Sequence, residues 1–142
     1  MSVADTRGRD VRSGGHPAIT AASLLLVILG AGWFVGLAYV LPYIVVNRDL
    51  PILVGIPAGS GRIYDAFGLD AVIAALTLNA VVQVLAVLAG VWLWRSRRKG
   101  AVLGTITIAA GPIFWYGFGL PFPPWIAVLQ LGLMAAGWRS LR

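Results

Sequence analysis

The chain has 142 residues, of which 59% are hydrophobic and only 11% are charged, and its mean hydropathy is +0.87. A soluble globular domain carries about 25% charged residues. The composition therefore argues against a soluble domain, a disordered chain and a nucleic-acid-binding protein. The chain contains no cysteine, which excludes disulfides, iron–sulfur clusters and thiolate metal sites.

Four apolar segments are candidates for membrane-spanning helices, each of which needs about 20 mainly apolar residues. They lie at residues 18–41, 69–94, 101–118 and 123–138. The last segment is the shortest and reaches spanning length only if its flanks are included or the helix stands upright. The sequence therefore predicts an all-α fold, in which residues 18–142 form one membrane domain, a four-helix transmembrane bundle.

Basic residues are distributed unevenly about these segments. Nine of the eleven lie before the first segment, between the second and third, or after the fourth, and only Arg48 and Arg62 lie in the remaining connections. By the positive-inside rule, both termini are expected in the cytoplasm of a multi-pass protein of the plasma (inner) membrane. The net charge of +6 then reflects this topology and contact with anionic lipid headgroups, not a nucleic-acid partner.

Two stretches with different compositions flank the first apolar segment. Residues 1–17 are polar and rich in glycine and arginine, which predicts a mobile basic cytoplasmic leader before an uncleaved membrane anchor. Residues 42–68 contain three prolines and four glycines, which predicts one long outer loop. Within it, residues 44–46 and 52–54 flank a turn-like Asn-Arg-Asp sequence, and they either pair as a short hairpin or lie on the membrane interface.

Three amides are expected to face the interior of the bundle. Asn79 and Gln83 are four residues apart and share one face of a helix. Gln130 lies on a matching stripe of small and polar residues in the fourth segment. Amides within hydrocarbon seek partners on other helices. The first interpretation of these residues is hydrogen bonding between helices, and the alternative is the polar lining of a ligand site or pore.

Proline and glycine motifs predict local geometry within the helices. Pro112 is expected to bend the third segment. Thr107 or a neighbouring residue is expected to form a hydrogen bond with the carbonyl that the proline leaves without a donor. Pairs of glycines four residues apart occur at Gly32 and Gly36 and at residues 100 and 104. Such pairs allow close packing of helices, either within one protomer or against a partner.

No catalytic, cofactor or metal site is predicted. The interiors of the four segments contain no charged residue, the chain has no glutamate, and its single histidine, His16, lies in the leader. A buried carboxylate for proton transfer, a histidine general base and the usual haem or zinc ligands are therefore missing. Asp70 is interpreted as a helix N-cap or as a negative charge that the helix dipole stabilises. The protein is expected not to be an enzyme.

One local pattern resembles a known kind of protein. Residues 41–57 contain Leu-Pro-Tyr and then Asn-Arg-Asp-Leu-Pro-Ile-Leu-Val-Gly-Ile-Pro. This stretch resembles the loop of small two-helix membrane proteins that accompany sodium/solute symporters, which carry a similar Asn-Arg-x-x-Pro-x-x-x-Gly-x-Pro segment. The aromatic run that usually follows is replaced here by residues 58–62, Ala-Gly-Ser-Gly-Arg, and two further helices are added. The resemblance implies an accessory subunit.

The sequence as a whole thus predicts a non-catalytic accessory or assembly subunit of a membrane complex. Its expected partners are the lipid bilayer and either another membrane protein or a second copy of the chain, because four short spans leave little room for a transport path. The alternative is a small homo-oligomeric transporter or channel with an amide-lined path. The preference for arginine over lysine, with abundant Ala, Gly and Val, indicates a bacterial source.

Overall fold

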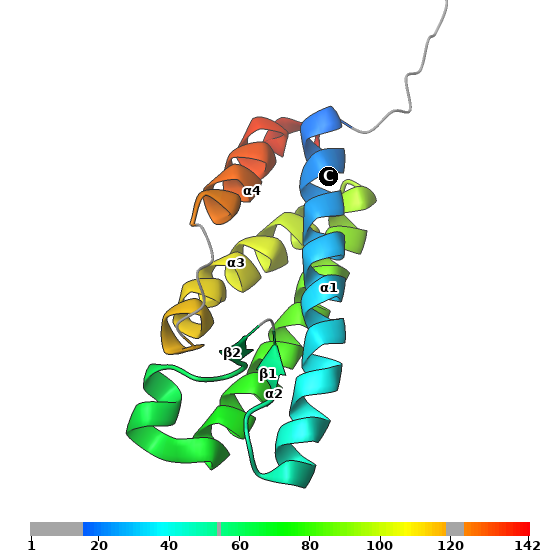
Figure 1. The fold of residues 1–142 in the computed structure, drawn as a ribbon. Helices are drawn as coiled ribbons and strands as arrows, with labels where there is room; N and C mark the ends of the chain where they lie inside the picture. Colours follow the sequence, from blue (N-terminus) through cyan, green and yellow to red (C-terminus); the bar gives the residue numbers. More distant parts are fainter. Residues whose placement is uncertain (1–15, 54, 119–123) are drawn as a thin grey trace, which may run out of the picture.

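The computed structural model describes residues 16–53, 55–118 and 124–142, and these residues are predominantly helical (Figure 1). The elements are α1 (Pro17–Asn47), β1 (Ile52–Leu53), β2 (Ile56–Pro57), α2 (Arg62–Trp94), α3 (Arg98–Phe118), α4 (Trp125–Ala136) and a short 3-10 turn, Trp138–Ser140. Helices α1 and α2 run antiparallel along each other, and α3 packs on α2. The prediction of an all-α fold is confirmed.

Three of the helices, α1, α2 and α3, are long and apolar enough to cross a membrane. Helix α4 has 12 residues and is therefore about 18 Å long, against about 30 Å of bilayer hydrocarbon. Figure 1 shows α4 beside only the first half of α1. The expected fourth span at 123–138 is thus a shorter helix than the apolar run indicates, and residue 123 lies outside the described residues.

The long loop expected at 42–68 is shorter in the structure. Helix α1 continues through Pro42 and ends at Asn47, where Arg48 adopts a left-handed conformation with φ 54° and its N–H binds the carbonyl of Ile44. Proline removes one N–H donor, but the apolar residues that follow it still satisfy their backbone groups best within a helix. At the other end, α2 begins at Arg62 and contains a non-helical residue at Gly68 (φ 78°). The helix beyond that break, residues 69–94, corresponds to the second predicted segment.

A short hairpin fills part of the shortened loop. Strands β1 and β2 are antiparallel, with Ile52 opposite Pro57 and Leu53 opposite Ile56. The N–H of Ala58 extends this pairing to the carbonyl of Pro51, at 2.8 Å. The alternative of a hairpin between residues 44–46 and 52–54 is wrong, because residues 44–46 belong to α1. Residue 54 lies outside the described part of the chain.

Glycines allow α1 and α2 to approach closely. A Cβ atom at Gly30 would lie 3.0 Å from the side chain of Val87, and one at Gly90 would lie 2.9 Å from the carbonyl oxygen of Ser23. The pair at residues 100 and 104 is also packed within the protomer. Gly32 and Gly36 differ, because a Cβ atom at either would meet nothing within 4 Å. The two glycine pairs that look alike in sequence therefore have different surroundings.

The basic segments gather at one end of the molecule, which we call the basic end. Ser96 and Arg98 pair with Arg142 through backbone hydrogen bonds of 2.8 and 2.9 Å, and the start of α1 lies beside the end of α4 (Figure 1). Six exposed cationic side chains lie here: Arg95, Arg97, Arg98, Lys99, Arg139 and Arg142. The remaining residues of the predicted leader, 1–15, lie outside the described residues.

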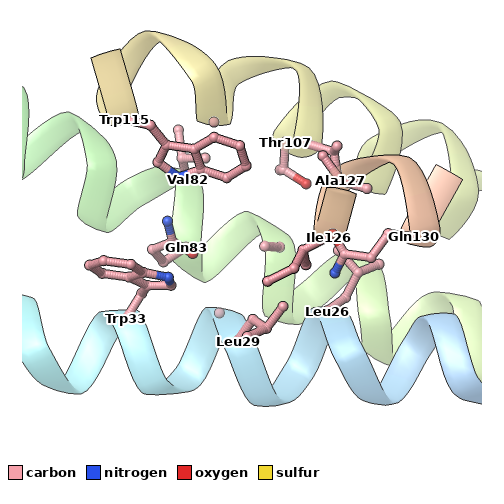
Figure 2. A pocket seen from close by; sticks show the side chains of 14 residues that line it. Leu26, Leu29, Trp33, Val82, Gln83, Thr107, Trp115, Ile126, Ala127 and Gln130 are labelled. Atoms are coloured by element: carbon pink, nitrogen blue, oxygen red, sulfur yellow. The ribbon is translucent and has the colours of Figure 1, made fainter. Parts of the chain in front are cut away.

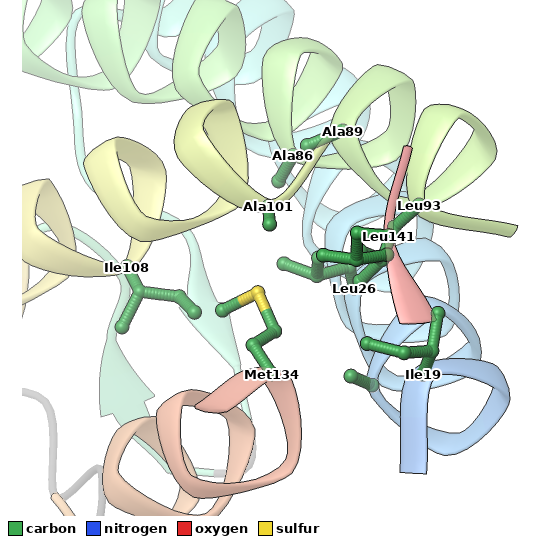
Figure 3. Close-up of a cluster of buried hydrophobic side chains, with 10 residues drawn as sticks. Ile19, Leu26, Ala86, Ala89, Leu93, Ala101, Ile108, Met134 and Leu141 are labelled. Atoms are coloured by element: carbon green, nitrogen blue, oxygen red, sulfur yellow. The ribbon is translucent and has the colours of Figure 1, made fainter. Parts of the chain in front are cut away.

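Buried side chains form two clusters along the helices. One lies toward the basic end and contains, among others, Ile19, Leu26, Leu93, Met134 and Leu141, so that it joins α1, α2 and α4 to the residues after α4 (Figure 3). The other lies at the hairpin end and includes residues such as Val40, Ile44 and Val72. The polar side chains predicted from sequence lie between these two clusters.

Candidate functional site

The three predicted amides are placed on the inner faces of α2 and α4. Asn79 and Gln130 are each only 6% exposed, and Gln83 is half-buried. The Nε2 atom of Gln83 donates a hydrogen bond of 2.9 Å to Oδ1 of Asn79. The structure thus brings Asn79 and Gln83 into direct contact along one helix face.

Gln83 and Gln130 line the same small cavity, which we call the central cavity (Figure 2). Its volume is about 70 Å³, and its walls come from all four helices. Thr107 contributes a hydroxyl from α3, and Trp33 and Trp115 contribute indoles from α1 and α3. A polar cavity needs only about 10–15 Å³ to hold a water molecule. The central cavity is therefore large enough for several waters.

Gln130 presents its amide to this cavity. Among the residues that the structure describes, no hydrogen-bond partner for its side chain is present. Its amide atoms border open space, because every fully buried side-chain nitrogen or oxygen of the described residues has a partner. Gln130 is therefore best satisfied by water or another small hydrogen-bonding molecule in the central cavity.

A second, larger space, which we call the hairpin pocket, lies between the hairpin and the helices. It has a volume of about 570 Å³. Helix α1 contributes Trp33, Gly36, Leu37 and Val40, the hairpin and the residues after it contribute Leu53 and residues 56–61, α2 contributes Leu76 and Asn79, and α3 contributes Phe118. Sequence reasoning missed this pocket, because its roof is a hairpin that the sequence did not define.

The Asn79–Gln83 pair separates the two spaces. Asn79 lines the hairpin pocket, Gln83 lines the central cavity, and Trp33 lines both. The predicted polar seam is thus a partition between the small central cavity and the larger hairpin pocket, both of which have mainly apolar walls. Sequence spacing identified the residues of this partition, and the alternative interpretation placed them beside a ligand site or pore, but the sequence did not predict two separate spaces.

Pro112 lies within α3, which continues through it to Phe118. The Thr107 hydroxyl donates to the carbonyl of Gly104, at 2.9 Å. The residue whose carbonyl loses a partner to a proline is four positions earlier, and here that residue is Ile108. Thr107 therefore does not bond the carbonyl that Pro112 leaves free, and a bend at Pro112 stays a prediction.

Charged residues at the hairpin end are engaged with neighbours on other elements. Arg48 forms an ion pair of 2.9 Å with Asp70, and both side chains are exposed. The carboxylate of Asp70 therefore interacts with Arg48 and not with the helix dipole alone. The guanidinium of Arg62 lies 4.2 Å from the centroid of the Tyr116 ring and donates a hydrogen bond to the Tyr116 hydroxyl. Cation–π contacts of this kind hold the first turn of α2 against α3.

Comparison of the chain with family models, curated proteins and solved structures finds no match.

Proposed function

We propose that the chain is a small integral membrane protein of a bacterial plasma membrane and acts as a non-catalytic accessory or assembly subunit of a membrane complex. Three helices of membrane-spanning length and apolarity support the location. The observation that carries the subunit role is the glycine pair Gly32 and Gly36 on α1, where an added Cβ would meet nothing within 4 Å; Gly36 also lines the hairpin pocket.

Within a bilayer, exposed apolar side chains are covered by lipid and give no drive for association. Helices associate instead where small residues allow the backbones to approach closely. In this protomer the packed glycines, such as Gly30 and Gly90, already serve the contact of α1 with α2. Gly32 and Gly36 serve no such contact in the described part of the chain, and they therefore offer a packing site for a helix of another protein.

This proposal is tested with the double variant Gly32→Leu/Gly36→Leu. The purified complex is captured from the native host in mild detergent, and the partner is quantified by mass spectrometry. We expect the partner to be lost, because two leucine side chains would hold the approaching backbone away. Folding of the protomer should be unchanged, because the new side chains meet nothing within 4 Å of their Cβ atoms.

The matched control is Gly132→Leu. Gly132 lies on α4 and is also a helical glycine with nothing within 4 Å of an added Cβ, but it is not part of the pair on α1. We expect this variant to retain the partner. Retention of the partner by the double variant, or its equal loss from the control, would contradict the proposal.

The alternative function is a homo-oligomeric transporter or channel. The unpartnered amide of Gln130 in the central cavity favours it. Under this alternative, Gln130→Leu leaves assembly intact but abolishes flux through reconstituted vesicles. Under the accessory role, the purified chain supports no flux, and the same substitution changes the free energy of unfolding little, because leucine replaces an amide that forms no hydrogen bond with the described residues.

Membrane orientation is a further prediction, with both termini in the cytoplasm. The chain has no native cysteine, so a single Ile52→Cys or Arg97→Cys variant gives one labelling site; both positions are exposed. In intact cells, a membrane-impermeant maleimide should label Cys at 52 in the hairpin. It should label Cys at 97, at the basic end, only after permeabilisation. The reverse pattern would contradict this orientation.

A further inference from the structure

The size and walls of the hairpin pocket are those of a ligand site. Sites for small molecules typically have volumes of about 300–1,000 Å³ and mainly apolar walls, and the hairpin pocket has about 570 Å³. Leu37 and Val40 line it from α1, and Leu76 lines it from α2. Such walls favour a ligand with an apolar body.

One polar side chain in the wall is buried and only partly satisfied. Asn79 is 6% exposed, and its Oδ1 atom already accepts the hydrogen bond from Gln83. The Nδ2 group of Asn79 has no partner among the described residues. Because no fully buried side-chain nitrogen or oxygen among them lacks a partner, this group borders open space. Two other side chains with polar atoms line the pocket: Ser60 donates its hydroxyl to the carbonyl of Pro57, at 2.8 Å, and Trp33 carries an indole N–H and also has an interaction partner. Asn79 therefore offers an N–H donor to an occupant of the pocket.

The lining is also uncharged. None of the described residues that line the pocket carries a titratable charge, and nearby Arg48 and Arg62 are engaged with Asp70 and Tyr116. A charged headgroup would lose its hydration in this pocket without gaining a countercharge. The occupant is therefore expected to be neutral.

The roof of the pocket is held in place by close backbone contacts. Gly61 (φ 145°) is packed so tightly that an added Cβ would lie 2.8 Å from the carbonyl oxygen of Gly117 on α3. Gly59 (φ 93°) faces Val72 of α2, at 3.1 Å from an added Cβ. Both glycines have positive φ values that other residues rarely adopt, and their close contacts place the backbone after the hairpin against α2 and α3.

From these observations we infer that the hairpin pocket binds a neutral, largely apolar molecule with one uncharged oxygen, of the class of long-chain alcohols and ketones. The chain of the ligand lies along Leu37, Val40 and Leu76, and its oxygen accepts a hydrogen bond from Nδ2 of Asn79. Gly36 belongs both to the lining of this pocket and to the glycine pair on α1, but the ligand contacts proposed here, at Leu37, Val40, Leu76 and Asn79, do not depend on the accessory role.

The test uses a hexadecanol that carries a photoreactive diazirine in its chain. The full-length protein in detergent is irradiated with increasing probe, and the labelled peptides are mapped by mass spectrometry. We expect saturable labelling of residues 36–40 and of the region around residue 76. A hexadecane probe with the same diazirine but no hydroxyl should label these residues about three- to tenfold more weakly, the equivalent of one lost hydrogen bond.

Two leucine variants separate binding from packing. Asn79→Leu and Gln83→Leu both remove the hydrogen bond between these side chains, but only Asn79→Leu removes the donor from the hairpin pocket. We expect Asn79→Leu to reduce labelling by the hydroxyl probe about three- to tenfold and Gln83→Leu to leave it unchanged. A third variant, Ala58→Phe, fills the pocket from its lining without touching the amides and should abolish labelling.

Three outcomes would overturn the inference. The first is equal labelling by the alcohol and hydrocarbon probes, which would mean that the pocket is only a hydrocarbon-filled space. The second is equal loss of labelling in Asn79→Leu and Gln83→Leu, which would assign both amides to helix packing. The third is unsaturable labelling spread over outward-facing residues such as Ile28 and Ile113. Recovery of the partner is measured with the Gly32→Leu/Gly36→Leu variant, whereas probe labelling is measured with the variants at Asn79, Gln83 and Ala58, so failure of one proposal is distinguished from failure of the other.

Discussion

Replacement of Gly100 by alanine is expected to lower the free energy of unfolding by about 1–3 kcal/mol, the usual cost of overpacking a tight contact. An added Cβ atom would lie 2.8 Å from the carbonyl oxygen of Ala89 and 2.8 Å from the carbonyl carbon of Trp92, and would contact the backbone nitrogen of Leu93. These are backbone atoms of α2, which cannot turn aside as a flexible side chain can. The measurement is chemical unfolding in detergent micelles followed by circular dichroism.

The controls for Gly100→Ala are alanine substitutions at Gly32 and Gly132. Both glycines are helical and have nothing within 4 Å of an added Cβ. Since alanine is favoured over glycine in a helix by about 0.5–1 kcal/mol, these variants should be neutral or slightly stabilised. If Gly100→Ala behaves like the two controls, the close packing of α2 on α3 is incorrect.

The apolar pattern of the sequence predicted the main helices because burial in hydrocarbon and backbone hydrogen bonding impose the same requirement on each segment. The prediction was wrong where proline was interpreted as a helix end. Pro42 loses one hydrogen bond, but the apolar residues after it keep theirs by continuing α1 to Asn47. The break in α2 occurs instead at Gly68 (φ 78°), because glycine adopts that conformation without steric cost.

The residues of the candidate site were predicted better than the site itself. The spacing of Asn79 and Gln83 gives one helix face, and the structure joins the two side chains by a hydrogen bond. The spaces on either side of the pair depend on elements distant in sequence. The hairpin pocket needs the fold of residues 52–57 over α1 and α2, and the central cavity needs α4 opposite α2. Local periodicity contains no information about either arrangement.

Because α4 is short, its packing against the other helices depends strongly on the residues that follow it. A helix of 12 residues buries little surface by itself, and only Gln130 and Met134 of α4 are fully buried. After α4, the chain turns and pairs with the connection between α2 and α3, through backbone bonds between Arg142 and both Ser96 and Arg98. The Nε atom of Arg98 also donates to the carbonyl of Leu141, at 3.2 Å. This clasp holds α4 against the rest of the bundle.

Leu141 is the apolar anchor of the clasp, and Leu141→Ala is expected to lower the free energy of unfolding by about 2–5 kcal/mol. The Leu141 side chain is 3% exposed and lies in the buried cluster near Leu26 and Leu93 (Figure 3). Its truncation leaves a cavity where α1, α2 and α4 meet. The loss is measured by chemical unfolding in micelles, and hydrogen exchange reports which helices open.

The matched control is Leu131→Ala on α4, where the leucine side chain is 38% exposed and its truncation opens no cavity. We expect this control to unfold like the unmodified chain. In Leu141→Ala, amide exchange should accelerate first in α4, because that helix depends on the clasp, while the central turns of α1 and α2 stay protected by their contact at Gly30 and Gly90. Uniform acceleration of amide exchange in all helices would mean that α4 unfolds together with the rest of the bundle. A loss of stability no larger than that in Leu131→Ala would mean that the clasp does not hold α4.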